Sequence, residues 1–443
     1  MKEKYELYYS KREIGISHYP MPASKAPEYP FTNADFLNSQ PEKEVHMLVY
    51  VHIPFCEHIC PFCPYHKIVY EEKQAEVYVE RLLEEIKAYA DTPYIQKAVV
   101  DAVYFGGGTP SCLSEKQLME ILKFLKDHLR FGGEPEITVE GNPHTFSCSK
   151  MQTLKDAGVN RISFGIQTFE EKMAQFMEVP HSPKEAAEAI KHAKNTGFEK
   201  VSIDLMYHLP GQSVEAWMAD VERAVLSEAD HITLFPFVQI PGSRICKKMQ
   251  QENRMVSSLE TELKMCQCAA DFLQNQGYKQ ESTYDFAKPG KESLYGKLHF
   301  QQHLDLLGLG MGAFGEVNRR CYINTGDFKD YLGYVNDGRF PIHLQDYVYR
   351  EDEIFSVLSM GLRMLEVDLE RLKNTGKNVF EIFARQIKAL TERNLLEITD
   401  GKIRLTREGI LWGNNICKEF YSEAYKKTLP AWQRMEELAR VKR

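Results

Sequence analysis

Between residues 46 and about 240 the sequence alternates short apolar stretches with long amphipathic ones, and this alternation limits the possible folds more than any other feature. Several short stretches are rich in β-branched residues, as buried parallel strands are. The longer stretches between them, such as 75–90 and 114–129, have helical periodicity. We expect strands at 47–53, 98–106, 136–141, 161–167, 200–207 and 231–237.

Strands that alternate with helices pair in parallel through right-handed crossovers, so the sequence predicts an α/β fold. Six such units fit an open sheet and also a partial (βα)6 barrel of the TIM type. In both architectures ligands bind at the carboxyl ends of the strands, in the loops that follow them. Functional residues are therefore expected in those loops.

The rest of the chain divides into three parts by composition. Residues 1–45 are polar and rich in Tyr and Pro, which favours an extended arm lying on the body. Residues 241–345 are irregular and rich in Gly and aromatic residues, and we treat them as an extension of the 46–240 barrel. Residues 346–443 are expected to form a mostly helical, winged-helix-like domain with helices at 352–365 and 379–396, a hairpin at 396–406 turning at Asp400–Gly401, and a last helix from Arg407.

Composition excludes several classes of function. The net charge is −8, which argues against nucleic acid as a partner and makes a lid or docking role the better expectation for the winged-helix-like domain. No apolar run reaches the length of a membrane span, and the first residues lack the apolar core of a signal peptide. We expect a cytoplasmic protein, in which the ten cysteines are thiols or metal ligands.

Three of those cysteines, Cys56, Cys60 and Cys63, follow the first predicted strand in a C-x3-C-x2-C pattern. Such a loop can supply three thiolates to a four-iron cluster and leave the fourth iron open. Zinc is the alternative, because His58 and His66 lie close enough in sequence to complete a tetrahedral site. Three unliganded thiols in a polar loop would be prone to oxidation, which disfavours a purely structural role.

The cysteine loop and the segment Gly106-Gly107-Gly108-Thr109-Pro110 one strand later together resemble the radical S-adenosylmethionine (SAM) superfamily. The resemblance implies a [4Fe-4S] cluster on the three cysteines and SAM chelated at the open iron. It also implies that the glycine segment binds the SAM amino group through backbone carbonyls, since glycine allows close approach.

More specifically, residues 45–425 resemble the HemN family of oxygen-independent coproporphyrinogen III oxidases. The resemblance rests on YVHIPFC, YFGGGTPS, VEGNP, SFGIQTF, IDLMYHLPGQ, DFAKPG, LLGLGMGAFG and GLRM…LLEITDGKIRLTREG. It implies that Tyr50, Glu140, Gln167 and Asp204 contact the first SAM. It further implies a second SAM, bound in part by Gly308, Gly310, Gly312 and Ala313.

The chain departs from the HemN family pattern at two positions. The oxidase has a fourth cysteine where this chain has Tyr65, which weighs against the decarboxylation reaction. The family arginine that would pair with the SAM carboxylate is replaced by Val179. Lys172 and Lys288 are the cations that we consider as substitutes.

Three functions follow from the resemblance. The first is a class C radical SAM methyltransferase acting on an aromatic or haem-like tetrapyrrole, which fits Tyr65. The second is the coproporphyrinogen III oxidase reaction. The third is a HemW-like haem chaperone, which the absence of that branch's His-Asn and Tyr-Trp segment disfavours. His299 and His303 have the spacing of a metal or haem ligand pair, although two surface histidines are the commoner explanation. Expected partners are a small-molecule substrate and a flavodoxin- or ferredoxin-type electron donor, and the chain is expected to be a monomer.

Overall fold

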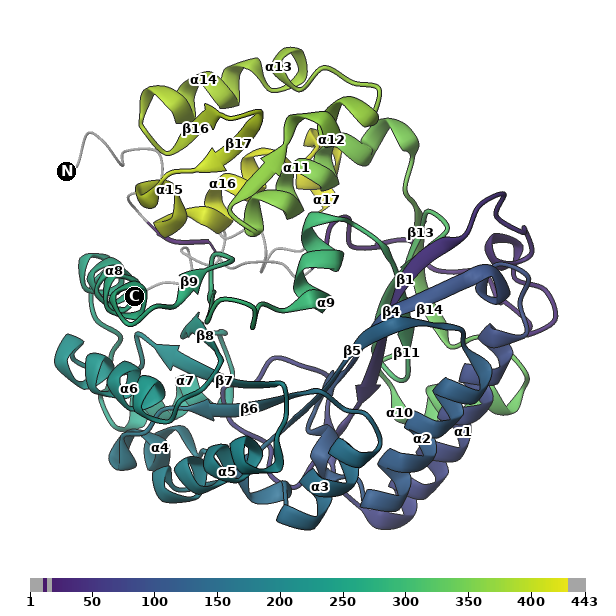
Figure 1. Cartoon of the computed structure of the whole chain (residues 1–443), viewed down its shortest axis with the longest axis horizontal. Helices are drawn as coiled ribbons and strands as arrows, with labels where there is room; N and C mark the ends of the chain where they lie inside the picture. The colour runs from purple at the N-terminus through teal and green to yellow at the C-terminus, as the bar shows by residue number, and fades with distance from the viewer. Residues whose placement is uncertain (1–10, 14–17, 429–443) are drawn as a thin grey trace.

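The computed structural model describes residues 11–13 and 18–428, and its centre is one curved 12-stranded sheet (Figure 1). The strand order is β14-β13-β12-β11-β1-β4-β5-β6-β7-β8-β10-β9. Seven neighbouring strands, from β11 to β8, run parallel. The strands of this sheet are β1 (Val45–Ile53), β4 (Ala98–Gly107), β5 (Phe131–Gly141), β6 (Arg161–Gln167), β7 (Lys200–Tyr207), β8 (His231–Pro236), β9 (Lys279–Gln280), β10 (Asp285–Ala287), β11 (Asp305–Leu309), β12 (Phe314–Val317), β13 (Arg320–Asn324) and β14 (Ile342–Tyr347).

The six strands expected from the sequence are confirmed as β1, β4, β5, β6, β7 and β8, and the α/β barrel with them. Helices follow the strands and cover the outer face of the sheet (Figure 1). Serine side chains cap several of these helices, for example Ser114 at α2 and Ser182 at α5. The helices of this part are α1 (Glu72–Ala90), α2 (Glu115–His128), α3 (Cys148–Asp156), α4 (Glu171–Met177), α5 (Pro183–Thr196), α6 (Val214–Leu226), α7 (Arg244–Gln251) and α8 (Leu259–Asn275).

The two faces of the sheet differ in polarity because strand residues alternate between them. The outward residues, such as Val49, Phe164 and Ile203, pack with α1, α2, α3, α5 and α6 in one large apolar core. Alternate residues on the central strands are polar and face the inside of the curve. Glu140 and Asp204 among them keep partial exposure to solvent, although the residues on either side of Asp204 are fully buried. The inner face is therefore the side on which a polar ligand can be bound.

Residues 241–345 complete the same sheet, which the sequence did not indicate. β11 pairs in parallel with β1, and β12, β13 and β14 continue the sheet in antiparallel pairs. A helical stretch made of α9 (Leu294–Gly296) and a π-helical turn, Lys297–Gln301, lies against the inner side of β4. Helix α10 (Phe328–Asn336) packs on α1.

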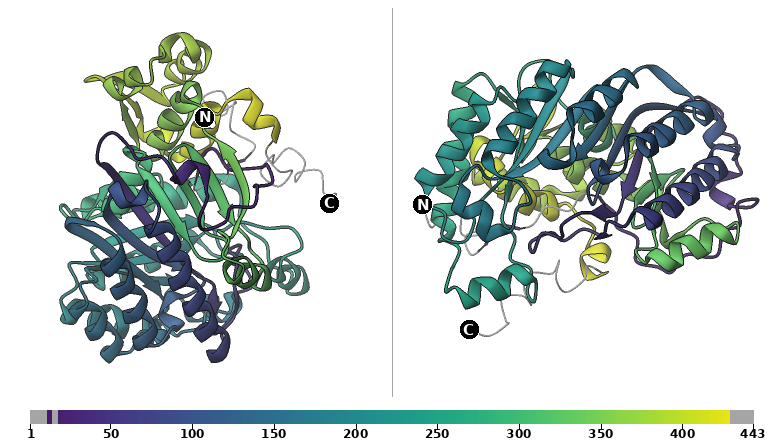
Figure 2. Two further views of the ribbon diagram at one scale, coloured as in Figure 1. Left: turned by 90° about the vertical axis from the view of Figure 1, so that its right-hand side faces the viewer. Right: turned by 90° about the horizontal axis from the view of Figure 1, so that it is seen from below.

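Residues 353–428 form the C-terminal unit, which has its own apolar core and lies across the open side of the curved sheet (Figures 1 and 2). The expected hairpin is confirmed as β16–β17, and Asp400 and Gly401 at its turn both have positive φ. Its elements are α11 (Glu353–Arg363), β15 (Glu366–Asp368), α12 (Leu369–Asn374), α13 (Val379–Ile382), α14 (Ala384–Glu392), β16 (Leu396–Thr399), β17 (Lys402–Leu405), α15 (Arg407–Leu411), α16 (Gly413–Glu419) and α17 (Glu423–Thr428).

The single helix expected over 379–396 is wrong. The helix is interrupted at Phe383, whose ψ of 22° is not helical. Phe383 is 2% exposed and packs edge-on against Phe355 and Phe420, at centroid distances of 5.5 and 5.1 Å. Burial of this aromatic ring in the core of the C-terminal unit accompanies the break.

The described part of the N-terminal segment lies along the body, as an arm would. Its backbone bonds to the edge of β14, with Ala26 N donating to His343 O at 3.0 Å, and Phe36 and Leu37 join the main core. Nearer the start, Met21 N donates to the hydroxyl of Tyr425 in the C-terminal unit. The division into arm, barrel, extension and C-terminal domain stays a prediction.

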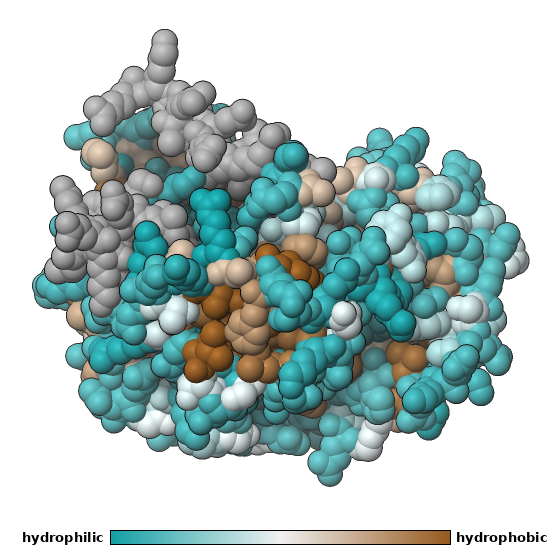
Figure 3. All heavy atoms as spheres, turned by 90° about the horizontal axis from the view of Figure 1, so that it is seen from above, coloured by the Kyte–Doolittle hydropathy of each residue, from teal (hydrophilic) through white to brown (hydrophobic). Residues whose placement is uncertain are grey.

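The surface seen from above is mostly hydrophilic, with one apolar area near its middle (Figure 3). Within the described ranges, none of the helices combines the length and the apolar character needed to cross a membrane. A cytoplasmic location and a monomeric state stay predictions.

Candidate functional site

The cysteine loop begins at the carboxyl end of β1 and is closed by a short parallel pair, β2 (Phe55–Cys56) and β3 (Ile68–Val69). Cys56 is buried, and its Sγ lies 3.4 Å from the hydroxyl of Thr109, which donates to it. Cys63 N donates to Cys60 O at 3.3 Å. The ammonium of Lys67 donates to the carbonyls of Cys63 and Tyr65, both at 2.8 Å, and holds the end of the loop.

The three thiols are close enough to affect one another. Burial and the neighbouring Cys63 and Cys56 together raise the pKa of Cys60 to about 12. A thiol in this environment is protonated unless a metal supplies positive charge, which removes the proton on binding. Binding of a metal centre by these thiols would therefore release protons.

The three thiols are donors that a four-iron cluster or a zinc ion could take. Across the part of the chain that the structure describes, no group of three or more Cys, His, Asp or Glu side chains is already arranged around a metal-ion position. The His66 imidazole lies against Gly312 and Gly326, 3.1 and 2.8 Å from where a Cβ on each would be, and its carbonyl faces His52 Nε2 at 3.1 Å.

The glycine segment after β4 packs directly on the cysteine loop. Gly108 N donates to Ile53 O at 2.8 Å, and Thr109 N donates to Phe55 O at 2.7 Å. A Cβ on Gly107 would lie 2.7 Å from the imidazole of His52, and its φ of +114° suits only glycine. These contacts fix the position of the Gly106–Gly108 backbone relative to the thiols.

Two carboxylates line the inner face next to this loop. Burial, together with the charge of Asp204, raises the pKa of Glu140 to about 7, and Tyr104 donates a hydrogen bond to it. Burial raises the pKa of Asp204 to about 6. A cationic ligand between the two would relieve their repulsion, so the pair is suited to bind positive charge.

Gln167 ends β6 in the left-handed conformation, with a φ of 68°, at an irregularity in the β6–β7 pairing. A Cβ on Gly165 would lie 2.9 Å from its amide nitrogen. Gln167 therefore lies at the edge of the sheet where β4 ends in the glycine segment. Tyr50, on β1, lies on the opposite side of β4 from β6, and its ring is 6.3 Å from that of Tyr104.

The glycine run after β11 lies at the same edge, since β11 runs parallel to β1 and Gly308 pairs with Tyr50. Its glycines are required by contacts within the chain. A Cβ on Gly308 would lie 2.1 Å from Phe314 O, and one on Gly310 would lie 2.4 Å from the Tyr78 hydroxyl. Gly312 has a φ of 72°, and Ala313 is buried. Binding of a second SAM by this run stays a prediction.

Of the two cations suggested to replace the family arginine, Lys288 lies away from the cysteine loop and the role of Lys172 stays a prediction. Lys288 follows β10 and lies beside the amino end of β8, at the opposite end of the sheet from the cysteine loop. Lys172 lies on the exposed first turn of α4. Val179 packs in an apolar cluster with Phe62 of the cysteine loop. Arg244, at the start of α7, was missed, and its guanidinium donates to Ile59 O in that loop at 3.1 Å.

His299 and His303 do not form a ligand pair. His299 is buried and its Nε2 lies 3.1 Å from Nδ1 of His18, whereas His303 Nε2 lies 3.4 Å from the carboxylate of Glu316. The π-helical turn sends the two rings to different partners. The alternative of two surface histidines is also wrong.

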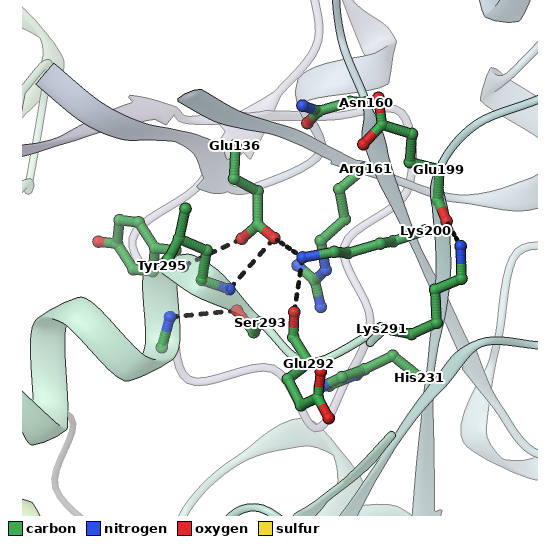
Figure 4. Close-up of polar contacts among 12 residues, drawn as sticks. Glu136, Asn160, Arg161, Glu199, Lys200, His231, Lys291, Glu292, Ser293 and Tyr295 are labelled. Atoms are coloured by element: carbon green, nitrogen blue, oxygen red, sulfur yellow. Dashed lines mark hydrogen bonds and ion pairs between the residues drawn. The ribbon is translucent and has the colours of Figure 1, made fainter. Parts of the chain in front are cut away.

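A polar network behind the carboxylates was also missed (Figure 4). Glu136, four residues before Glu140 on the same face of β5, accepts bonds from Lys200 at 2.7 Å and from Tyr295 N at 3.0 Å. Arg161, on β6, donates to Ser202 at 3.1 Å and lowers the pKa of both Glu140 and Asp204. The period-2 pattern of polar residues in these strands is the signal that could have revealed it.

Comparison with known proteins gives consistent results along the chain. The sequence model of the Radical SAM superfamily matches residues 50–224, and that of the HemN C-terminal domain matches residues 348–412. The heme chaperone HemW of Bacillus subtilis (strain 168) is 30% identical over 378 residues, covering 84% of this chain and 99% of that protein. The oxygen-independent coproporphyrinogen III oxidase of Escherichia coli (strain K12) is 27% identical over 413 residues, covering 89% of this chain and 88% of that protein.

Two further similarities extend the comparison. The anaerobilin synthase of Escherichia coli O157:H7 is 28% identical over 372 residues, covering 84% of this chain and 83% of that protein. Among solved structures, coproporphyrinogen III oxidase (HemN) from Escherichia coli, described as a radical SAM enzyme, superimposes with a TM-score of 0.79. It is 24% identical and covers 91% of this chain and 97% of that chain, which shows a shared fold.

Proposed function

Because this chain belongs to the HemN-like radical SAM family, we propose that it binds its [4Fe-4S] cluster through Cys56, Cys60 and Cys63 and acts on a haem-type tetrapyrrole. The observation that carries the proposal is the joining of the three-thiol loop to the glycine segment by the bonds from Gly108 and Thr109. SAM bound at such a cluster is cleaved reductively and supplies a 5′-deoxyadenosyl radical.

The residues of the chain have distinct tasks in binding SAM. The Gly106–Gly108 backbone lies against the cysteine loop, where its carbonyls would accept bonds from the SAM ammonium. Glu140 and Asp204 attract the cationic part of SAM and accept bonds from its ribose hydroxyls. Arg161 stabilises both carboxylates in the ionised form.

The proposed substrate class rests on the relatives. The chaperones are named for heme and the oxidases for coproporphyrinogen III, and both are tetrapyrroles. These names support oxidative decarboxylation and haem binding more directly than methyl transfer. Tyr65 disfavours the oxidase reaction, since it stands where the oxidase carries a cysteine. Methyl transfer to a tetrapyrrole therefore remains a third candidate.

One anaerobic experiment separates these reactions. The reconstituted protein is incubated with dithionite, SAM and either haem or coproporphyrinogen III, and 5′-deoxyadenosine and product masses are measured. Loss of two carboxyl groups indicates the oxidase reaction, and gain of a methyl group indicates methyl transfer. Stoichiometric haem binding without 5′-deoxyadenosine indicates the chaperone function.

The matched control is the protein with Cys56, Cys60 and Cys63 all changed to Ala, which should form no 5′-deoxyadenosine. If the unmodified protein neither forms 5′-deoxyadenosine nor binds either tetrapyrrole, the proposal is wrong. An electron donor of flavodoxin or ferredoxin type is a further prediction, tested by replacing dithionite with the reduced donor protein.

A further inference from the structure

The first turn of α7 is bonded to the middle of the cysteine loop. The guanidinium of Arg244 donates to Ile59 O at 3.1 Å, and Ile245 N donates to Pro61 O at 3.3 Å. These two acceptor residues are the neighbours of Cys60 in the chain. Cys60 itself is half-buried, so α7 contacts the loop beside a thiol that remains partly accessible to solvent.

The side chains of α7 divide into an apolar face and a basic face. Ile245 is buried in the apolar cluster that also contains Phe62 of the cysteine loop. Residues spaced by three and four positions share one side of a helix. Arg244, Lys247 and Lys248 have this spacing, and we call them the α7 basic face. The helix therefore holds the loop with one face and presents cations on another.

The α7 basic face has an excess of positive charge. The helix contains no acidic residue, and Glu178 pairs with two of its cations, at 2.8 Å from Arg244 and 3.0 Å from Lys248. The Arg244 side chain nevertheless stays 60% exposed. Lys247 is exposed and forms no ion pair with any residue that the structure describes. Three cations against one carboxylate leave a surplus of two positive charges, on a chain whose net charge is −8.

The proposed cleavage of SAM needs one electron for each radical, and that electron has to come from outside the chain. A protein that delivers it must bind where the cysteine loop approaches the surface. The α7 basic face adjoins the loop at the residues on either side of Cys60. Positive charge at this place attracts an acidic protein, raises the rate of encounter and orients the partner.

We propose that the α7 basic face is the docking surface for an acidic one-electron carrier protein. A carrier bound there lies beside Ile59 and Pro61, on either side of Cys60. One electron leaves the reduced carrier and enters the cluster, and no proton or other group is transferred. This assignment rests on the proposed function and names the helix that recognises the electron donor.

The test is equilibrium binding of an acidic flavodoxin to the cluster-reconstituted protein at low ionic strength. Lys247→Glu reverses the unpaired charge and should weaken binding by roughly threefold to tenfold. The difference should shrink at high salt, where exposed charges are screened. Lys191→Glu, at an exposed position of α5, makes the same change in net charge and should bind flavodoxin as the unmodified protein does.

The rate of cluster reduction separates loss of docking from damage to the cluster. Reduction of Lys247→Glu by a subsaturating concentration of flavodoxin hydroquinone should slow by a factor similar to the loss of binding. Reduction by dithionite needs no docked protein and should keep the rate of the unmodified protein. Lys247→Arg retains the charge and should behave as the unmodified protein does in both reactions. Iron content after reconstitution shows whether the cysteine loop of each variant is intact.

The possible failures are distinguishable. If Lys247→Glu binds flavodoxin as well as the unmodified protein does, or no better than Lys191→Glu, the docking surface is wrong. It is also wrong if the unmodified protein binds no flavodoxin, or if it forms a dimer that Lys247→Glu dissociates, which would make a second copy the occupant. The proposed function survives each of these results, because cluster assembly and SAM cleavage with dithionite test it separately. If no cluster assembles, the proposed function and the docking surface are both wrong.

Discussion

The hydroxyl of Tyr78, on α1, donates a 2.7 Å hydrogen bond to the carbonyl of His52, the last residue but one of β1. The same oxygen accepts a 3.0 Å bond from Met311 N, in the glycine run after β11. One buried phenol thus fixes the start of the cysteine loop and the glycine run relative to each other. Both segments thus share one hydrogen-bonding partner on α1.

Tyr78→Phe should destabilise the protein by about 2–4 kcal/mol, because it leaves a buried carbonyl and a buried N–H without partners. Urea unfolding of the apoprotein measures this loss. Tyr347→Phe removes a hydroxyl from a ring that is 43% exposed and should change stability by less than about 0.5 kcal/mol. Equal stability of the two variants would show that the Tyr78 bonds are unimportant.

Each of Cys56→Ala, Cys60→Ala and Cys63→Ala should abolish stable cluster assembly, since each removes one of three thiolate ligands. Anaerobic reconstitution of the unmodified protein should give about four irons per chain and a broad thiolate-to-iron absorbance. Cys148→Ala is the control, because Cys148 is exposed and lies at the start of α3. Retention of full iron content by all three loop variants would refute the cluster assignment.

Gly107→Ala should weaken SAM binding at least tenfold, because the new Cβ would overlap the His52 imidazole and alanine disfavours the φ of +114°. Calorimetric titration of the reconstituted protein with SAM measures the effect. Gly133→Ala is a suitable comparison, since nothing lies within 4 Å of its Cβ position. Unchanged SAM affinity in Gly107→Ala would contradict the proposed place of the SAM amino group.

SAM affinity should rise with pH between about 5.5 and 7.5. Glu140, with a pKa of about 7, and Asp204, with a pKa of about 6, are protonated at the lower end and ionised at the upper end. A cationic ligand prefers the ionised pair, so binding should weaken about tenfold per pH unit below 7. Glu140→Gln should bind SAM more weakly at pH 7.5 and show a flatter pH profile. If the SAM affinity of Glu140→Gln still depends steeply on pH, the titrating group is not Glu140.

Arg12→Ala should loosen the contact between the N-terminal segment, the barrel and the C-terminal unit. The Arg12 guanidinium bonds to Glu262 at 2.9 Å, to the Tyr207 hydroxyl at 2.5 Å and to Leu411 O at 2.8 Å. Without the guanidinium the buried Glu262 carboxylate loses its neighbouring positive charge, which should lower the free energy of unfolding by about 3–5 kcal/mol. Limited proteolysis should cut the N-terminal segment faster than in Lys11→Ala, which removes a more exposed cation. Equal proteolysis rates would show that Arg12 does not hold the segment.

The barrel could be predicted from the sequence because its strands and helices are defined by local periodicity. β6 and β7 begin and end at the predicted residues, 161–167 and 200–207. The proposed site residues at strand ends followed from the same pattern, since parallel strands place their carboxyl ends at one edge. Their roles came from the family resemblance.

The features that could not be predicted from the sequence depend on contacts between residues far apart in the chain. The partner of His299 is His18, 281 residues away, and no local pattern identifies it. The break at Phe383 depends on Phe355 and Phe420, and the site of Lys288 depends on the antiparallel pairing of β10.

The pairing of β1 with β11 has a consequence for synthesis of the protein. The ribosome makes β1 first, but one of its two edges is covered only after residue 309 has emerged. Until then the strand that leads into the cysteine loop presents unpaired backbone groups to other nascent chains. Shortened chains that end before residue 305 should aggregate, and cluster insertion should follow emergence of residue 309.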